Sequence, residues 1–223
     1  MDREARVRVW DIPTRLFHWS AVALFCVSWF SATQGQMRVH LISGLTFLVV
    51  LLFRIAWGLV GSTTARFSDF LHPPRHVIGY LKGLAGGENM FHAGHNPAGG
   101  WMVLVLISVL LAQVATGLFA NDGVRFHSPL ALLVSEDAST RLTGIHGVIF
   151  NLILLLVWCH VVAVGFYLLV KADNLVWPMV TGRKPRNRLP PELNLVFTRL
   201  YIALLLLAVS AGVAVWLAFG LSF

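Results

Sequence analysis

The chain of 223 residues is 57% hydrophobic and only 12% charged, and its mean hydropathy is +0.74. This composition excludes an ordinary soluble domain and indicates a membrane protein. The formal net charge is +7, which raises nucleic-acid binding as an alternative. We expect no nucleic-acid partner, because the Lys and Arg residues flank apolar segments and form no separate basic domain.

In chain order, five apolar segments are long enough to cross a bilayer as helices, which takes roughly 20 residues. They cover residues 16–33, 40–60, 100–120, 143–170 and 196–219. The sequence WDIPTR at residues 10–15 leads directly into the first segment without a small-residue cleavage site. We therefore expect a retained span and not a signal peptide. The sequence predicts an all-α membrane protein with five transmembrane helices.

The distribution of Lys and Arg predicts the orientation of these helices. Positive residues are concentrated in the N-terminal tail and in the connections 61–99 and 171–195, whereas the other connections are poor in them. An excess of Lys and Arg marks the cytoplasmic side of a membrane. We therefore expect a cytoplasmic N-terminus and a periplasmic C-terminus, with residues 143–170 running from the outer to the inner side.

Two histidines lie within the apolar segment 143–170. His146 and His160 are fourteen residues apart, which on a helix is about 1,400° of rotation, within about 40° of whole turns, and about 21 Å of rise. They therefore share one face at two depths. His18, in the first turn of the first span, matches the inner depth, and His40, at the start of the second, matches the outer depth.

Depth alone therefore predicts two pairs, His18 with His160 and His40 with His146. Each pair is suited to bind one haem iron between two helices, since imidazole is a usual haem ligand and bundle cores contain such sites. Two haems about 20 Å apart along the helix would conduct electrons across the bilayer. The alternative is that these are unrelated polar residues that bond to backbone or to a neighbouring helix.

Small and basic residues near these histidines extend the hypothesis. Gly44, Gly144 and Gly147 would permit a porphyrin to approach, or would serve ordinary small-residue helix packing. Arg54 is fourteen residues beyond His40 and on the same face, so a propionate of the inner haem is its predicted partner, with snorkelling to headgroups as the alternative. Arg15 is a second candidate for a propionate, although we expect it just outside the first span and exposed.

Three separated motifs are VWDIPTRLFHW at residues 9–19, GHNPAGGWM at 94–102 and RLTGIHG at 141–147. They resemble the bacterial cytochrome b-561 and nickel-hydrogenase b-type cytochrome family, and the similarity runs from about residue 9 to 183. The resemblance implies a four-helix transmembrane core in the bacterial inner membrane with two non-covalent b haems, which exchange electrons with quinone and a redox partner. Carried over by position, the iron ligands are His18, His40, His146 and His160.

The resemblance also divides the chain. Residues 1–183 would form the di-haem core, and residues 184–223 a basic loop and an additional transmembrane helix. The role of that helix is open between partner docking, lipid-facing support and a feature of one branch of the family. The basic stretch 181–188 is interpreted as a topology anchor or as a site for anionic lipid.

The other candidates are in the connections. Cys26 and Cys159 are in no C-x-x-C-H motif, so we expect neither covalent haem nor an iron–sulfur centre. His95 is a candidate for quinone binding or proton exchange, since histidine titrates near neutral pH. We expect the Pro73-Pro74 pair to break any helix in the inner connection. The long connections 68–99 and 121–142 are candidates to cover the inner haem and to receive a periplasmic partner, respectively.

Three classes of function follow. The first is a di-haem cytochrome b that passes electrons between the quinone pool and a periplasmic cytochrome c or a hydrogenase- or dehydrogenase-like partner. The second is a superoxide:quinone oxidoreductase, with Arg38, Arg125 and Arg141 guiding the anion. The third is a haem-free metal transporter or membrane structural protein.

Overall fold

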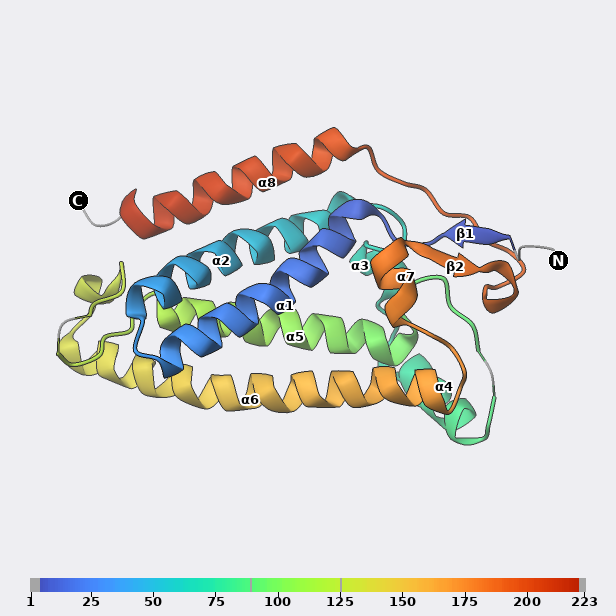
Figure 1. Cartoon of the computed structure of the whole chain (residues 1–223), viewed down its shortest axis with the longest axis horizontal. Coiled ribbons are helices and arrows are strands. Elements are labelled where there is room, and N and C mark those ends of the chain that lie inside the picture. The colour runs from blue at the N-terminus through green and yellow to red at the C-terminus, as the bar shows by residue number, and fades with distance from the viewer. Residues whose placement is uncertain (1–4, 89, 125, 221–223) are drawn as a thin grey trace.

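The computed structural model describes residues 5–88, 90–124 and 126–220. Five of its helices are long and apolar enough to cross a membrane (Figure 1), which confirms the predicted all-α membrane class. They are α1 (Ile12–Thr33), α2 (Met37–Val60), α5 (Pro97–Gly117), α6 (Glu136–Leu169) and α8 (Leu200–Val215), the last extended by a π-helical turn, η3 (Trp216–Gly220).

Polar residues just before the apolar runs determine where two of these helices begin. Asp11 caps α1, because its Oδ1 accepts a hydrogen bond of 2.8 Å from the Thr14 backbone N–H. Asn96 caps α5 in the same way, with 2.7 Å to the Gly99 N–H. Both caps satisfy backbone donors that a helix start leaves unpaired. Because α1 begins at Ile12, four residues before the predicted span, His18 lies in its second turn and not its first.

The last helix of the predicted core is longer than expected. Glu136 begins α6, and its N-cap Ser135 accepts a hydrogen bond of 3.3 Å from the Ala138 N–H. The apolar pattern missed this turn because Glu136, Asp137 and Arg141 are charged. At 34 residues, α6 exceeds the roughly 20 residues that a bilayer needs, so its ends extend beyond the apolar layer.

The transmembrane helices form an uneven bundle. The closest backbone packing joins α1 to α2, α5 to α6, and α2 to both α5 and α8. In Figure 1, α8 and α6 lie on opposite sides, with α2, α1 and α5 between them. Within the described residues, neither α1 nor α2 is among the main packing partners of α6. The helix α6, which contains His146 and His160, is thus not closely packed against α1 and α2, the helices that contain His18 and His40.

The additional helix α8 packs against α2 on the side away from α6. Its Ala203 contacts a cluster with Phe53 and Trp57, and its Ala214 a second cluster with Leu48 and Leu118. Small residues thus face α2, whereas most of the large apolar side chains of α8 are exposed. Of the three roles considered, this packing is consistent with lipid-facing support.

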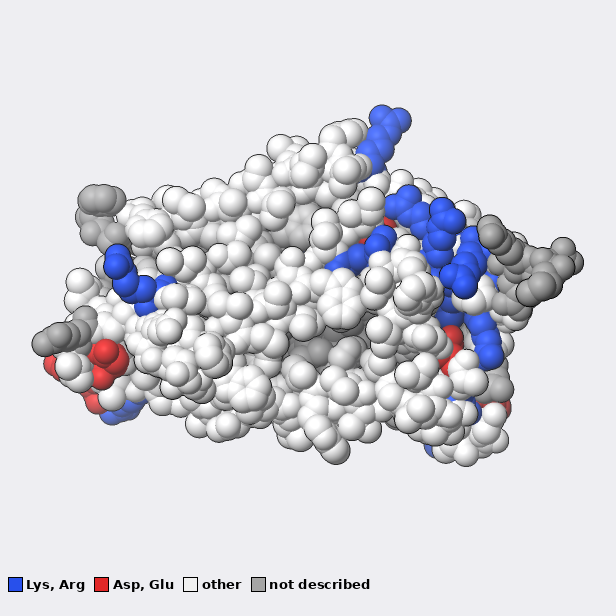
Figure 2. All heavy atoms as spheres, viewed as in Figure 1, with Lys and Arg blue, Asp and Glu red and all other residues white. Residues whose placement is uncertain are grey.

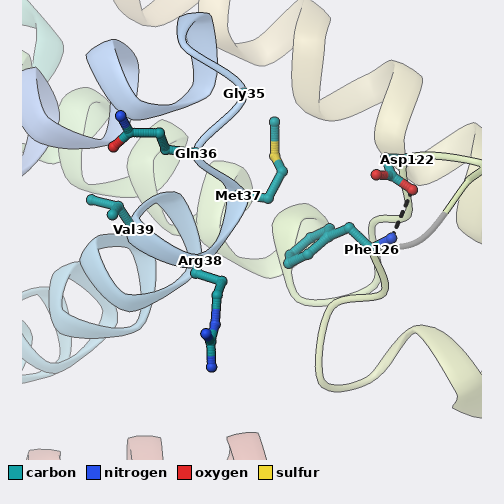
Figure 3. Close-up of a pocket in the computed structure, with 7 residues that line it drawn as sticks. All are labelled: Gly35, Gln36, Met37, Arg38, Val39, Asp122 and Phe126. Atoms are coloured by element: carbon teal, nitrogen blue, oxygen red, sulfur yellow. Dashed lines mark hydrogen bonds between the residues drawn. The ribbon is translucent and has the colours of Figure 1, made fainter.

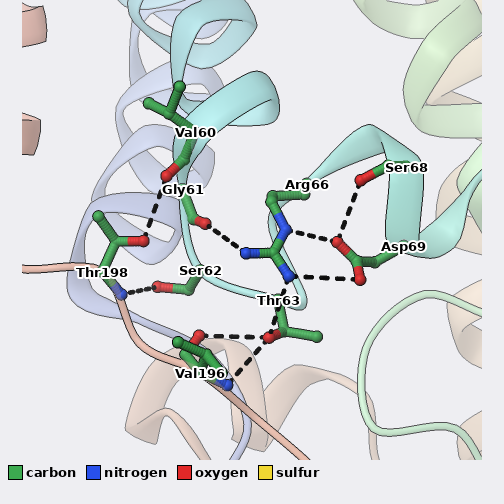
Figure 4. A network of polar contacts seen from close by, with 9 residues as sticks. All are labelled: Val60, Gly61, Ser62, Thr63, Arg66, Ser68, Asp69, Val196 and Thr198. Atoms are coloured by element: carbon green, nitrogen blue, oxygen red, sulfur yellow. Dashed lines mark hydrogen bonds and ion pairs between the residues drawn. The ribbon is translucent and has the colours of Figure 1, made fainter.

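Hydrogen bonds attach the segment before α8 to the end of α2 (Figure 4). The Thr198 N–H donates to Ser62 Oγ at 3.1 Å, and the Val196 N–H donates to Thr63 Oγ1 at 2.9 Å. On the other side of the same loop, Arg66 forms an ion pair of 2.6 Å with Asp69. These bonds hold the start of α8 beside the core.

The inner connection contains two short helices, α3 (Phe67–Phe70) and α4 (Pro74–Ala85). As expected, no helix runs through the Pro73-Pro74 pair, because α3 ends at Phe70 and the pair begins a new helix, with Pro73 as the N-cap of α4 and Pro74 as its first residue. Proline is compatible with that position, since the first helical N–H has no intrahelical partner.

Short elements complete the same end of the molecule. They are β1 (Arg6–Arg8), α7 (Val176–Thr181), β2 (Arg183–Pro185) and the 3₁₀ turn η2 (Arg186–Arg188), while the 3₁₀ turn η1 (Ala131–Leu133) lies at the opposite end. The strands β1 and β2 pair antiparallel beyond the ends of the helices (Figure 1).

Candidate functional site

The inner histidine pair lies between α1 and α6. The ring centres of His18 and His160 are 6.5 Å apart, with an angle of 52° between the ring planes. Both side chains are half-buried, and His18 Nδ1 is a buried atom without a hydrogen-bond partner. The structure therefore brings together the two residues that sequence depth paired.

The outer pair lies between α2 and α6. The ring centres of His40 and His146 are 6.0 Å apart. His40 Nδ1 is 2.9 Å from the Ser28 carbonyl oxygen, and His146 Nδ1 is 2.9 Å from the Gln113 carbonyl oxygen. A ring whose Nδ1–H donates to a carbonyl leaves Nε2 as a lone-pair donor, the usual arrangement of a metal-binding histidine. In His146 the Nε2 atom accepts from Gln113 Nε2 at 3.0 Å, so a metal at this atom would replace that hydrogen bond.

Both separations fit two imidazoles that bind one metal from opposite sides. A metal–imidazole nitrogen bond is about 2 Å long, and the nitrogen lies roughly 1 Å from its ring centre. Opposed ligands therefore have ring centres about 6 Å apart. At both pairs the rings face each other from helices whose backbones do not pack closely on one another.

Unpaired buried polar atoms provide a second test of what the inner site accommodates. Arg54 is 2% exposed, and both of its terminal nitrogens are buried without a partner. The rings of Phe17, Phe67 and Phe70 lie 5.1–5.9 Å from its guanidinium carbon. The buried Asp11 carboxylate interacts electrostatically with Arg54 but forms no hydrogen bond with its terminal nitrogens. A buried cation whose donors are unsatisfied is unfavourable, so the guanidinium is suited to bind a further anion. Snorkelling of Arg54 to headgroups is therefore wrong, because the side chain lies inside the protein.

Arg15 belongs to the same end of the bundle. The expectation that it lies outside the first span and is exposed is wrong, because it is within α1 and half-buried. Its Nη2 donates to the Val180 carbonyl of α7, and its Nε is buried without a partner. The sequence could not predict this, since α7 is far from α1 along the chain.

His95 lies beside this inner site, in the segment before α5. Its ring is 4.9 Å from Trp10 and 4.7 Å from Phe70, and its Nδ1 is buried without a partner. Burial, with Arg54 and the two inner histidines nearby, lowers the pKa of His95 to about 3. A neutral ring at pH 7 serves as a hydrogen-bonding group, and proton exchange by His95 near neutral pH is disfavoured.

Acid is expected to destabilise the protein through His95. The folded ring stays neutral down to about pH 3, whereas in the unfolded chain it protonates near 6.5. The stability it contributes is thus fully present above pH 6.5 and is lost as the pH falls toward 3. At pH 5 the loss is on the order of 1–2 kcal/mol. A His95→Gln variant should lose less of its thermal midpoint between pH 7 and 5 than the wild type, and equal losses would contradict this.

The three glycines chosen from the sequence are not in close helix contacts. A Cβ added at Gly44, Gly144 or Gly147 meets nothing within 4 Å. Tight small-residue packing is therefore not their role. The glycine that approaches a histidine is Gly117 of α5, where an added Cβ would be 2.9 Å from Cε1 of His146. No sequence pattern indicates this contact, because it joins two different helices.

A Gly117→Ala substitution is expected to disturb the outer site. The new methyl group would displace the His146 ring, whose Nδ1 is also held at 2.9 Å by the Gln113 carbonyl. We expect haem content measured as pyridine haemochrome to fall, with any remaining outer haem altered in its reduced-minus-oxidised spectrum. Gly212→Ala in α8, where an added Cβ meets nothing within 4 Å, is the control. Unchanged haem in both variants would contradict the expectation.

The fold and these contacts define a class, a multi-pass membrane bundle with two histidine pairs between its helices. The family model "Prokaryotic cytochrome b561" matches residues 9–182, and the chain belongs to this family. No curated protein and no solved structure matches the chain. The chain is therefore a multi-pass bacterial membrane cytochrome that binds b-type haem and functions in electron transfer. This membership overturns the haem-free alternative.

Proposed function

We propose that the protein binds two b haems, one between His18 and His160 and the other between His40 and His146. The observation that carries this proposal is the geometry of α6, which presents His146 and His160 to two other helices at ring separations of 6.0 and 6.5 Å. The haems supply reversible one-electron chemistry at two depths of the membrane. In this proposal residues 1–183 are the haem-binding core, and residues 184–223 are an attached loop and supporting helix.

Arg54 and Arg15 bind the propionates of the inner haem in this proposal. Both have buried nitrogens without partners, and guanidinium groups bind carboxylates with paired hydrogen bonds. The rings of Phe17, Phe67 and Phe70 keep water away from Arg54 and fix its position. At the outer site, the Ser28 and Gln113 carbonyls set the tautomers of His40 and His146.

The redox partners are proposed as quinone and a periplasmic electron carrier. Interconversion of quinol and quinone takes two electrons and two protons. Haems held by His18 with His160 and by His40 with His146 would supply the one-electron chemistry that links the quinone pool to a cytochrome c or to a hydrogenase- or dehydrogenase-like partner, in either direction. The distribution of charge supports the proposed orientation in the membrane. Lys and Arg gather at the end that contains β1 and β2 (Figure 2), as the cytoplasmic end of a membrane protein requires. The N-terminus is then cytoplasmic and the C-terminus periplasmic.

Haem content tests this proposal directly. The protein would be purified in detergent from cells with ample haem, and haem per chain measured as pyridine haemochrome. About two low-spin b haems per chain are expected from two bis-histidine sites. One haem per chain would show that one pair is wrongly assigned. Oxidation of the reduced haems by a quinone analogue would then test the quinone.

A second candidate function is a superoxide:quinone oxidoreductase, favoured by a hollow beside the outer pair. It has a volume of about 500 Å³ and is lined by Gly35, Gln36, Met37, Arg38, Val39, Asp122 and Phe126 (Figure 3). The guanidinium of Arg38 points away from Asp122 in Figure 3, and Asp122 accepts a hydrogen bond of 2.8 Å from the Phe126 N–H.

This candidate needs positive side chains that attract superoxide to the outer site, and an acidic neighbour offsets one of them. Arg141 is paired at 3.0 Å with Asp137, and Arg125 lies outside the described residues. We therefore place this candidate second. Superoxide-dependent reduction of a quinone by the purified protein, weakened in Arg38→Gln, would promote it.

A further inference from the structure

The pairing of β1 with β2 places arginines side by side at the inner end of the molecule. Arg8 lies directly opposite Arg183 in the antiparallel register, and Arg6 is the next residue on the same face of β1. All three are exposed. Directly opposed residues of an antiparallel pair project from the same face, and like charges there are destabilising. An anion bound between them would remove this repulsion.

The other face of the sheet is buried, and its one charged side chain, Lys184, is already in an ion pair. Val7 packs on a core cluster of Val9, Trp10 and Leu189. Its partner Lys184 is buried and forms an ion pair of 2.8 Å with Asp173. Asp173 is thus already paired with Lys184, and the exposed arginines are on the opposite face of the sheet.

The side-chain N–H groups of Arg6, Arg8 and Arg183 are available to a ligand. Within residues 5–88, 90–124 and 126–220, no carboxylate forms an ion pair with Arg6, Arg8 or Arg183, and no side-chain N–H of the three is hydrogen-bonded. The guanidinium carbon of Arg8 lies 4.3 Å from the centre of the Phe197 ring. Stacking orders a guanidinium through its face and leaves its edge N–H groups for an oxyanion.

Exposed apolar side chains next to the sheet indicate a lipid as the occupant. Trp177 and Val180 of α7 are 50% and 44% exposed, and Arg183 follows two residues after α7. The first turns of α1 hold α7 in place, since Trp19 Nε1 donates to the Met179 carbonyl at 3.3 Å. Trp177 is exposed on this short helix beside the first turns of α1, and Trp is enriched at the membrane–water interface, which is the depth of lipid phosphates.

We propose that the β1–β2 face, centred on Arg8 and Arg183, together with the exposed side of α7, binds the phosphate headgroup of an anionic lipid. Two adjacent guanidinium groups suit a phosphate through paired, charge-assisted hydrogen bonds. The apolar side chains of α7 contact the acyl chains below the phosphate. This site is independent of the haem and quinone assignments.

The test compares two double variants that remove equal charge from the same side of the protein. Arg8→Gln with Arg183→Gln removes the proposed site, and Arg75→Gln with Lys82→Gln removes two charges from α4 as the control. Each protein would be incubated in detergent with dioleoylphosphatidylglycerol or dioleoylphosphatidylcholine, and bound lipid counted by native mass spectrometry. Folding would be checked by size exclusion and helical circular dichroism.

The wild type and the α4 control should retain phosphatidylglycerol over phosphatidylcholine, and the Arg8/Arg183 variant should lose at least about tenfold of this retention. No preference in the wild type, or equal losses in both variants, would overturn the proposal. Complete displacement of the lipid by an equal concentration of inorganic phosphate would overturn the lipid as ligand. If the glutamine pair does not fold, Arg8→Lys with Arg183→Lys should still bind at least about threefold more weakly, and undiminished binding would reject the guanidinium site.

Discussion

A His160→Ala variant is expected to lose the inner haem and retain the outer one. His160 faces His18 at 6.5 Å between ring centres, and without His160 only one imidazole would remain to hold a haem at this site. The outer pair is His40 and His146, about four helical turns away along α6. Haem content should fall from about two to about one per chain, and the reduced-minus-oxidised spectrum should retain one low-spin b component.

The matched control for this variant is His76→Ala. His76 is an exposed histidine of α4, and it faces His72 and neither pair. It should leave both haems in place. Full haem occupancy in His160→Ala would show that the pair assignment is wrong. Loss of both haems together would instead show that the two sites fold as one unit.

The spans and the two histidine pairs follow from local sequence. Hydropathy over about 20 residues identifies a span, and the helix repeat places His146 and His160 on one face. Depth then identifies their partners on α1 and α2. These inferences depend only on positions along each helix. The structure adds which helices face each other, and that cannot be inferred from such positions.

Other features depend on contacts between segments remote in sequence. Hydropathy does not distinguish Arg54 at a headgroup from Arg54 enclosed by Phe17, Phe67 and Phe70, since two of those rings are on the separate helix α3. Nor does any pattern within α5 show that Gly117 approaches the ring of His146. Arg8 lies opposite Arg183 because β1 pairs with β2, and most of the chain lies between these two strands in the sequence.

The substitution Arg54→Met is expected to stabilise the haem-free protein but to weaken binding of the inner haem. Without haem, Arg54 is a buried cation whose terminal nitrogens have no hydrogen-bond partner and whose charge Asp11 offsets only in part. Its replacement by an apolar side chain of similar length removes the remaining cost. The haem-free variant should therefore be more stable than the haem-free wild type, by about 1–4 kcal/mol. With haem bound, the same change removes the partner of a propionate, so the inner haem should dissociate more readily.

The redox potential provides an independent measure of the same charge. A cation near the iron favours the reduced state, which has one positive charge less. At roughly 8 Å and an effective dielectric constant of 20, one unit charge contributes on the order of 2 kcal/mol, or roughly 90 mV for a one-electron couple. The inner haem of Arg54→Met should therefore have a midpoint potential lower by up to about 90 mV, while the outer haem is unchanged.

A redox titration of the purified variant, beside Arg75→Met as an exposed control on the same side, separates this effect from a general loss of positive charge. Arg75 is on the surface of α4, where solvent and salt screen it, so its removal should shift neither potential measurably. If Arg54→Met shifts the outer potential instead, Arg54 does not serve the His18/His160 site. If it lowers haem-free stability, its guanidinium has a partner that the contacts around Phe17, Phe67 and Phe70 do not include. The combination of a more stable haem-free protein and a weaker, lower-potential inner haem is specific to a cation placed for a bound anion, because a purely structural arginine would lower stability in both states.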